Sequence, residues 1–299
     1  MSEMKHIGII GIGYQGRKLA DIFSSQAEIV MCASRGNAER IAALKKRHPS
    51  IAVTNDYRDL LSDSKIEGVV IATPIDTHAA MASEALKAGK HVFVEKPLAT
   101  DKKTARALVE EAGAHNLSIF TGYTFLYHPC FFELQRILRD RPIESLYASW
   151  YKCGSFNEDI LWNLLVHDIA IVIALCGEPR KLTLEGTYRA ITDADVAYVH
   201  GVFGNNTPAT FTVDRIAPVR SKLIEFVLAD RIVAWHGDTL SIYDNESKEY
   251  REHFTSPSSD AALENEIQIF LKSMGNPAIA AENANISLST TRAVERLKS

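Results

Sequence analysis

This 299-residue chain has no long apolar run, no closely spaced pair of cysteines and no excess of basic residues. No stretch reaches the roughly 18 consecutive apolar residues that a membrane-spanning helix needs. The net charge of −4 and the pI near 6.2 leave no basic surplus to neutralise a nucleic-acid backbone. The opening residues, MSEMKH, are few and polar, unlike a secretory signal peptide. We therefore expect a cytoplasmic protein that binds neither nucleic acid nor a membrane.

Cysteine and histidine are present, but their spacing does not suit a metal ion. The four cysteines, Cys32, Cys130, Cys153 and Cys176, form no CxxC pair, and three of them lie in apolar surroundings. The ten histidines show no HxxxH pattern and no cluster with cysteine. The sequence thus predicts reduced, mostly buried thiols and no metal site.

Short apolar runs alternate with helical patterns over the first 122 residues. A chain of this length that is 46% hydrophobic is long enough for two domains. Continuous apolar strands between amphipathic helices are typical of a doubly wound parallel sheet, the Rossmann architecture. The predicted strands are HIGII, EIVMCA, GVVIAT, HVFVE and LSIFTG, and the predicted helices are Tyr14–Ser24, Ala38–Arg47, Thr77–Lys87 and Thr100–His115.

The alternation of apolar strands and amphipathic helices ends after Gly122, where we place the boundary between domains 1–122 and 123–299. Strand-like runs that alternate apolar and polar residues follow, as in antiparallel strands with one buried face. The sequence predicts an α+β domain with a mostly antiparallel sheet. Its strands are SLYASWYK, KLTLEGTYRA, VAYVHGVF, TPATFTVDRI, SKLIEFVLAD and RIVAWHGDTLSIYD, and its helices are Pro129–Arg139, Ile160–Cys176, Ala261–Ser273 and Asn285–Lys298.

A G-x-G-x-x-G pattern follows the first predicted strand and opens the first predicted helix. In that setting the pattern indicates a dinucleotide-binding turn. The first glycine permits the tight turn, the second admits the pyrophosphate, and the third lets helix and strand pack closely. The free N–H groups of the helix N-terminus then face the phosphates. The predicted cofactor-binding residues are Gly11, Ile12, Gly13, Tyr14, Gln15 and Gly16.

The end of the second strand indicates which dinucleotide is bound. Proteins that bind NAD usually place an acidic residue there for the ribose hydroxyls. This chain has Ser34 and Arg35 instead, and no acid. A hydroxyl and a guanidinium suit a 2′-phosphate, which a carboxylate would repel. We therefore favour NADP over NAD, with a plain surface arginine as the alternative for Arg35.

The tripeptide Glu95-Lys96-Pro97 stands at the carboxyl end of a predicted parallel strand. Ligands of such sheets bind outside the carboxyl ends of the strands. Lys96 is therefore a candidate catalytic residue, and a salt bridge to Glu95 is the alternative reading.

Around these residues the sequence resembles the glucose–fructose oxidoreductase, inositol dehydrogenase and rhizopine catabolism (Gfo/Idh/MocA) family. The resemblance covers nearly the whole chain and rests on GIGYQG, IATPIDTHAAMASEALKAGKHVFVEKPLA, TGYTFLYHP and NLLVHDIAIVIALCGEP. It implies a Rossmann domain joined to a C-terminal α+β domain with an open antiparallel sheet, whose free face often serves subunit contacts. It also implies oxidation or reduction of sugars, inositols or related cyclic alcohols with NAD(P).

The resemblance assigns roles to residues of the first domain. Thr73, Pro74 and His78 correspond to a segment that lines the cofactor. Glu95 and Lys96 correspond to the motif beside the nicotinamide. Lys96 is expected to hydrogen-bond the reacting oxygen and to exchange a proton with it. The Lys96–Pro97 bond is a candidate for the cis form, which proline permits at low cost.

His167 corresponds to the histidine that the family uses as acid or base. The family often has an aspartate four residues earlier, where this chain has Asn163. An amide can orient a hydroxyl or an imidazole but cannot accept a proton, so the proton falls to His167, with Lys96 as a relay. In a regular helix Asp159, Asn163 and His167 lie along one stripe. Asp168 faces elsewhere and is expected to be structural, and the alternative for His167 is a packing role.

Aromatic residues near the junction and on the later elements complete the predicted site. They are candidates for the wall of a substrate pocket, although tyrosine and tryptophan are also common in cores. The predicted substrate-binding residues are Tyr123, Tyr127, Tyr151, Trp162, Asn163 and His167.

These observations together predict an NAD(P)-dependent oxidoreductase. The expected substrate is a sugar, a cyclic polyol or a nucleotide-linked sugar, the last because the stretch around His167 resembles family members that act on nucleotide sugars. A cofactor-binding regulator that has lost catalysis is an alternative that Asn163 favours, and an imine reductase on the same fold is another. A sheet with one free face also predicts a homodimer or homotetramer.

Overall fold

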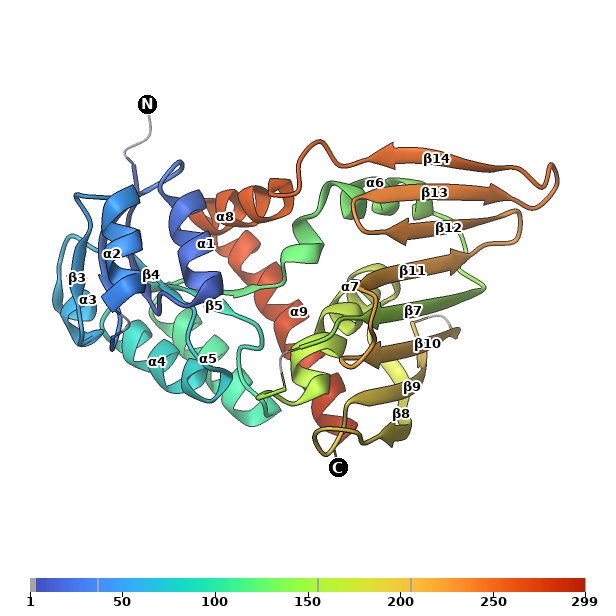
Figure 1. Cartoon of the computed structure of the whole chain (residues 1–299), viewed down its shortest axis with the longest axis horizontal. Helices are drawn as coiled ribbons and strands as arrows, with labels where there is room; N and C mark the ends of the chain where they lie inside the picture. Colours follow the sequence, from blue (N-terminus) through green and yellow to red (C-terminus); the bar gives the residue numbers. More distant parts are fainter. Residues whose placement is uncertain (1–3, 37, 155, 205, 299) are drawn as a thin grey trace. The chain divides into compact units, whose positions relative to one another are not determined.

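The computed structural model describes residues 4–36, 38–154, 156–204 and 206–298 (Figure 1). The chain forms two compact units, Met1–Tyr123 with Leu263–Leu288 and Thr124–Ala262 with Ser289–Ser299. The chain leaves the first unit directly after the predicted boundary. Residues 263–288 return to that unit, which the sequence did not indicate. The domain ranges 1–122 and 123–299 stay a prediction.

The first unit holds a six-stranded parallel sheet, which confirms the predicted Rossmann architecture. The strand order is β3-β2-β1-β4-β5-β6, and every neighbouring pair is parallel. Two short elements, β3 and α3, were not predicted. The strands are β1 (His6–Ile10), β2 (Glu28–Ala33), β3 (Ala52–Thr54), β4 (Gly68–Ile71), β5 (His91–Glu95) and β6 (Ile119–Gly122), and the helices are α1 (Tyr14–Phe23), α2 (Ala38–Arg47), α3 (Arg58–Ser62), α4 (Ile75–Lys87) and α5 (Lys102–Ala114).

A cluster of phenylalanines explains why residues 263–288 belong to this unit. Phe270 lies on α8 (Ala261–Ser273), and its ring centroid is 5.5 Å from that of Phe93 on β5. Phe23 and Phe120 complete the cluster, with ring centroids 6.0 and 5.7 Å from Phe93. The four rings are fully buried. Their burial supplies a large part of the hydrophobic stabilisation on this face of the sheet.

An asparagine on α9 (Pro277–Arg296) completes the edge of the same sheet. Asn283 is buried and accepts a hydrogen bond at 2.7 Å from the Thr121 N–H of β6, and its amide donates at 3.0 Å to the Thr121 carbonyl. The side chain thus pairs with the edge strand as a neighbouring strand would. This leaves neither backbone group of Thr121 unsatisfied.

The second unit holds an eight-stranded sheet in the order β14-β13-β12-β11-β7-β10-β9-β8. Among the described residues only the pair of β7 and β10 is parallel, so the mostly antiparallel prediction is confirmed. The predicted run 231–244 is a hairpin that turns at Gly237, and β14 was not predicted. The strands are β7 (Ser145–Tyr151), β8 (Pro179–Tyr188), β9 (Val196–Phe203), β10 (Thr207–Asp214), β11 (Ser221–Val227), β12 (Arg231–His236), β13 (Thr239–Asp244) and β14 (Tyr250–Thr255).

The predicted regular helix over Ile160–Cys176 is not regular. Leu161–Leu165 forms a π-helical turn, η2, before α7 (Val166–Cys176), and the Val166 N–H donates to the Leu161 carbonyl five residues back. The wider turn changes the angular spacing of the side chains, and the stripe of Asp159, Asn163 and His167 stays a prediction. Asp159 caps the start of the helix, accepting from the N–H groups of Leu161 and Trp162 at 2.9 and 3.3 Å.

Two further helical segments and the cysteines complete the description. The 3-10 turn η1 (Thr124–Tyr127) and α6 (Pro129–Leu138) precede β7. Cys32 and Cys130 are buried, Cys176 is half-buried and Cys153 is exposed, and all four thiols are free. Across the described residues, no helix combines the length and the apolarity needed to cross a membrane.

Candidate active site

The turn after β1 has the geometry that its three glycines predict. Gly11 has φ of +93°, and a Cβ there would lie 2.5 Å from the Ala72 carbonyl oxygen. A Cβ on Gly16 would lie 1.9 Å from the Gly11 carbonyl oxygen, whereas a Cβ on Gly13 would meet nothing within 4 Å. Gly11 and Gly16 therefore serve the turn itself. Gly13 leaves open space at the N-terminus of α1, which fits a pyrophosphate.

The other residues of the turn differ in their surroundings. The Ile12 side chain is buried in the core, whereas Tyr14 is 80% exposed. Gln15 hydrogen-bonds the carboxylate of Glu95 at the end of β5. Burial raises the pKa of Glu95, and Lys96 and Gln15 offset part of that rise. This hydrogen bond links α1, which begins in the glycine turn, to the last residue of β5, directly before Lys96.

His78 connects the ends of two neighbouring strands. Its ring is 1% exposed, with Nε2 2.9 Å from the Thr73 carbonyl oxygen and Nδ1 2.9 Å from the Pro97 carbonyl oxygen. Thr73 follows β4, and Pro97 follows β5 after a cis Lys96–Pro97 bond. The Thr73 hydroxyl lies 2.7 Å from that of Thr77. His78 therefore holds the segment directly after Lys96 and the Thr73-Pro74 segment together, at the carboxyl edge of the sheet.

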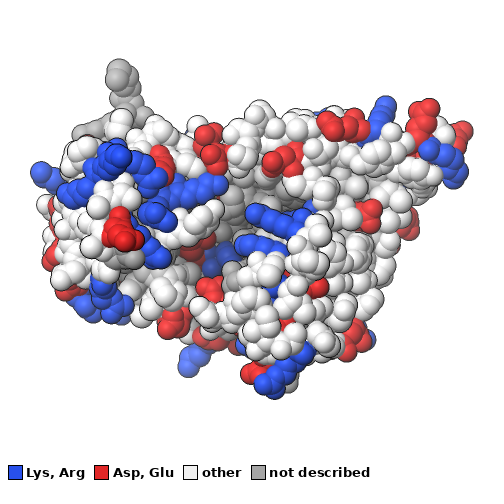
Figure 2. Space-filling model, in the orientation of Figure 1, with Lys and Arg blue, Asp and Glu red and all other residues white. Residues whose placement is uncertain are grey.

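Basic residues lie shortly after β2 and on α1 and α2. Ser34 donates its N–H to the Thr54 carbonyl at 2.9 Å, and Arg35 is exposed. Figure 2 shows lysine and arginine side chains over α1 and α2. These helices supply Arg17, Lys18, Arg40, Lys45, Lys46 and Arg47. Lys45, Lys46 and Arg47 end α2, and Arg47 pairs with Asp21, so the exposed Arg35 is the basic residue that suits an anionic group beside Ser34.

The second unit carries His167 within a triangle of aromatic rings. The centroid of the His167 ring is 5.3 Å from that of Phe125 and 5.2 Å from that of Trp150. His167 is half-buried, and Asn163 is 9% exposed on the π-helical turn. π-Helical turns occur often at functional sites. The structure therefore fixes the ring planes around the predicted acid or base.

The predicted aromatic wall divides into buried and accessible residues. Tyr123 and Trp162 are 1% and 3% exposed, as core residues are, whereas Tyr127 and Tyr151 are half-buried. Tyr151 ends β7, and the hydrogen bond that its hydroxyl donates to Tyr147 raises the pKa of Tyr151. The half-buried pair are the better candidates for substrate contact.

Sequence analysis missed Lys222, which contacts the buried Asp168 that was expected to be structural. Its ammonium pairs with Asp168, whose side chain is 1% exposed. The signal was available in SKLIEFV, where Lys222 and Ile224 occupy alternate positions and so share one face of the strand. Only the β7–β11 register, which sets Lys222 opposite Trp150, reveals that this face is the inner one.

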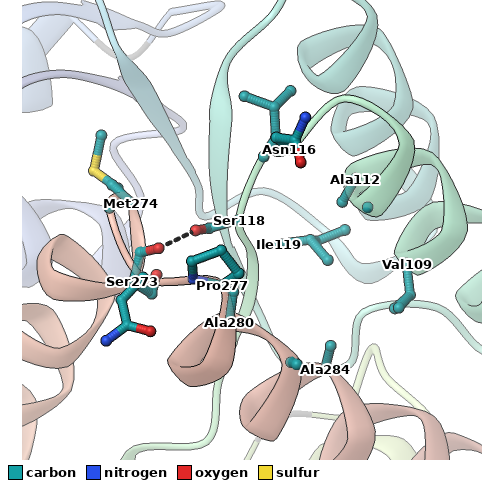
Figure 3. A pocket seen from close by; sticks show the side chains of 15 residues that line it. Val109, Ala112, Asn116, Ser118, Ile119, Ser273, Met274, Pro277, Ala280 and Ala284 are labelled. Atoms are coloured by element: carbon teal, nitrogen blue, oxygen red, sulfur yellow. Dashed lines mark hydrogen bonds between the residues drawn. The ribbon is translucent and has the colours of Figure 1, made fainter.

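The first unit also holds a cavity of about 400 Å³. Figure 3 shows its apolar lining, with residues such as Val109, Ile119 and Ala284, and the Ser118 hydroxyl that donates to the Ser273 carbonyl at 2.6 Å. Ile119 begins β6, so this cavity lies at the amino edge of the sheet. It is therefore not part of the glycine-turn site, which lies at the carboxyl edge.

Comparison with known proteins agrees with this geometry. Residues 5–123 match the profile of an oxidoreductase family with an NAD-binding Rossmann fold. UDP-N-acetylglucosamine 3-dehydrogenase of Acidithiobacillus ferrooxidans is 28% identical over 246 residues, which span 79% of this chain and 76% of that enzyme. A solved structure of that enzyme has a TM-score of 0.85 at 24% identity, covering 99% of this chain and 97% of the other.

Two further relatives are more distant or match less of the chain. Inositol 2-dehydrogenase of Salmonella typhimurium is 29% identical over 187 residues, which span 58% of this chain and only 55% of that enzyme. The structure of a 3-ketoreductase from Actinomadura kijaniata, in complex with NADP and TDP-benzene, has a TM-score of 0.85 at 20% identity. It covers 99% of this chain and 97% of the other.

The fold, the glycine turn and these matches define a nicotinamide-dependent oxidoreductase of the dehydrogenase and reductase class. Within that class, the match over residues 5–123 assigns the NAD-binding Rossmann domain to the Gfo/Idh/MocA family of oxidoreductases.

Proposed function

We propose that this enzyme transfers hydride between NADP and a carbon that bears a hydroxyl or carbonyl group, in a sugar, a cyclic polyol or a nucleotide-linked sugar. The observation that carries the proposal is the arrangement at the carboxyl edge of the first sheet. There the open space at Gly13 and the segment Glu95-Lys96 are linked through Gln15. The names of the two dehydrogenases among the relatives support the substrate classes.

The mechanism assigns separate tasks to the two units. A nicotinamide cofactor held at the glycine turn would supply the hydride chemistry. Lys96 of the first unit donates a hydrogen bond to the reacting oxygen, and Glu95 and the His78 contacts hold its segment in place. His167 of the second unit takes or returns the proton, while the Asn163 amide orients a hydroxyl or the imidazole without accepting a proton.

Steady-state kinetics with a substrate panel test this function. The panel contains UDP-sugars, free sugars and inositols with NADP⁺ and NAD⁺, together with the corresponding keto compounds and reduced cofactors. We expect Lys96→Ala to lower kcat by roughly 10²–10⁴-fold, the usual contribution of a positioned proton donor. The Kd for the cofactor should stay within about twofold, since charge and backbone at the glycine turn are unchanged.

Lys103→Ala is the matched control, because Lys103 is an exposed lysine of the same unit. It should leave kcat and the cofactor Kd unchanged. Turnover by Lys96→Ala at the wild-type rate would show that Lys96 does not act on the reacting oxygen.

The preference for NADP has its own test. Support comes from the exposed Arg35 and the neighbouring Ser34. Calorimetric titration should give tighter binding of NADPH than of NADH. Arg35→Ala should weaken NADPH binding by roughly 10–100-fold, the usual effect of losing a charge-assisted hydrogen bond, and leave NADH binding unchanged. Tighter binding of NADH by the wild type would overturn the preference.

A cofactor-binding regulator without catalysis is the second candidate, and Asn163 is the observation that favours it. If the enzyme is active and lacks only an acid at this position, Asn163→Asp should raise or preserve kcat. A regulator should instead bind NADPH and turn over no member of the panel.

We further propose that the enzyme is a homodimer or homotetramer that pairs through the outer face of the second unit's sheet. Tyr198 is 48% exposed on β9, and half-buried Tyr147, Leu223 and Ile232 share the sheet. An apolar face of this kind is usually covered by a partner. Multi-angle light scattering should give at least twice the 33.1 kDa of one chain, and a monomer would contradict this assignment.

A further inference from the structure

Four elements of the second unit converge on one buried ammonium group. Phe125 comes from η1, Trp150 from β7, His167 from α7 and Lys222 from β11. The three rings form a closed triangle, since the Phe125 and Trp150 centroids are 5.5 Å apart and His167 lies within 5.3 Å of both. Each ring therefore limits the tilt of the other two.

The Lys222 ammonium lies over two of these three rings, those of Trp150 and Phe125. Its Nζ is 4.1 Å from the Trp150 centroid and 4.6 Å from the Phe125 centroid. Both distances are well within the range of a cation–π contact. In the β7–β11 register Lys222 is directly opposite Trp150, so the strand pairing itself sets the cation against the indole. The ammonium thus contacts the same two rings that flank His167.

Asp168 fixes the other end of this arrangement. Its Oδ1 pairs with the Lys222 ammonium, and it directly follows His167 in α7. This ion pair therefore joins the first turn of α7, which carries His167, to β11, which carries Lys222. Asp168 Oδ2 has no hydrogen-bond partner among the described residues.

This buried ion pair contributes little net stability, because both charges lose their hydration. Burial raises the pKa of Asp168 and lowers that of Lys222, and in each case the attraction of the partner offsets only part of the shift. Buried ion pairs can often be replaced by apolar residues without loss of stability. A role beyond stability is therefore the better explanation for the presence of both charges beside His167.

We propose that Lys222, paired with Asp168, is a positioning residue that fixes the ring orientation of His167 through Phe125 and Trp150. The proposal deepens the proposed function and rests on it, because His167 is there the proton-handling group. Lys222 acts on the reaction only through these neighbours, and its side chain is 13% exposed.

The test compares a single variant with an apolar double variant. Lys222→Met leaves Asp168 buried without its partner, so its unfolding temperature should fall. Lys222→Met/Asp168→Leu removes both charges and should recover most of that stability. Lys248→Met, which changes an exposed lysine in the turn between β13 and β14, is the control and should match the wild type in every measurement.

The deciding measurement is the proton NMR spectrum of the His167 ring, assigned by its loss in His167→Gln. The ring protons lie in the ring currents of Phe125 and Trp150, so their shifts report the triangle directly. We expect displaced shifts in both Lys222 variants, even where the double variant has regained wild-type stability. We also expect kcat to fall by roughly 10–100-fold, as for a small misplacement of a catalytic group, with the cofactor Kd unchanged.

Wild-type His167 shifts in the stable double variant would overturn the proposal and leave the pair a structural one. This readout does not depend on turnover. A failure of the proposed function would appear separately, as absence of activity in the wild type with every substrate of the panel.

Discussion

The turn after β1 has glycine at three positions, and the reason differs between them. Gly11 and Gly16 are confined by the backbone of Ala72 and of Gly11 itself, whereas Gly13 faces open space. Gly11 alone of the three has a positive φ, and Gly13 has φ of −64°, which any residue can adopt. A mutation at Gly16 therefore tests the folding of the turn, and a mutation at Gly13 tests cofactor binding.

Gly16→Ala should destabilise the first unit, because its Cβ would overlap a backbone oxygen that cannot turn aside. We expect a loss of about 1–3 kcal/mol in the free energy of unfolding, as for an overpacked core. Gly13→Ala should keep or slightly raise stability, since alanine restricts the unfolded chain, but should weaken NADPH binding at least tenfold. Chemical denaturation and calorimetric titration measure the two effects. Wild-type NADPH affinity in Gly13→Ala would mean that the cofactor does not approach this residue.

Sequence reasoning at this scale predicted the local structure around the candidate site, whereas the roles of its residues stay predictions. The glycine spacing and the position of Lys96 after a strand are both local. Lys222 was missed because its importance depends on a cross-strand neighbour, Trp150, that is far away in the chain. Tyr123 and Trp162 were expected at a substrate wall but are buried, since aromatic side chains look alike in a sequence whether they line a pocket or fill a core.

At the scale of elements, the boundaries of helices follow from their caps. Asp101 precedes α5, and its carboxylate accepts a hydrogen bond at 2.8 Å from the Thr104 N–H. This bond is the first cause that lowers the pKa of Asp101. The irregular start of α7 had no such signal, because a π-helical turn needs only one extra residue and leaves the apolar pattern LWNLLVHDIAIVIAL nearly unchanged.

Asp101→Ala should cost about 1 kcal/mol of stability at neutral pH, the usual effect of losing an N-cap. Because the folded state lowers the pKa of Asp101, its contribution is present above the unfolded value of 3.8 and is lost as the pH falls through the lowered folded value. Thermal unfolding from pH 7 to pH 2 should show the difference between wild type and variant shrinking in that acid range. Asp101→Asn keeps an acceptor oxygen and serves as the control. A difference that stays constant down to pH 2 would contradict the capping role.

At the scale of the whole chain, residues 263–288 are the feature that no local pattern revealed. They follow the entire second sheet in sequence, yet they supply Phe270 and Asn283 to the first unit. The predicted helices near 261–273 and 285–298 were confirmed in kind, although α9 begins earlier, at Pro277. Periodicity predicts that a helix exists, but it does not say which sheet the helix covers.

Asn283→Leu should remove both hydrogen bonds to Thr121 and leave the buried Thr121 N–H unsatisfied, whereas the Thr121 carbonyl still accepts from the Tyr123 N–H. We expect a loss of about 1–3 kcal/mol in the free energy of unfolding, the usual cost of one such group. Asn285→Leu changes an exposed asparagine on the same helix and should have little effect. Equal stability of the two variants would show that the amide of Asn283 does not support the edge of β6.

The return of residues 263–288 also sets the order of events during synthesis. The six strands of the first sheet leave the ribosome early. The contacts that Asn283 makes with β6 and Phe270 makes with the phenylalanine cluster form only after residues 263–288 have been translated. At typical elongation rates of about 5–20 residues per second, this delay lasts on the order of ten to thirty seconds. During that time the nascent chain exposes an unpaired strand edge and an apolar face, so we expect it to need a chaperone for longer than a Rossmann unit encoded as one continuous segment.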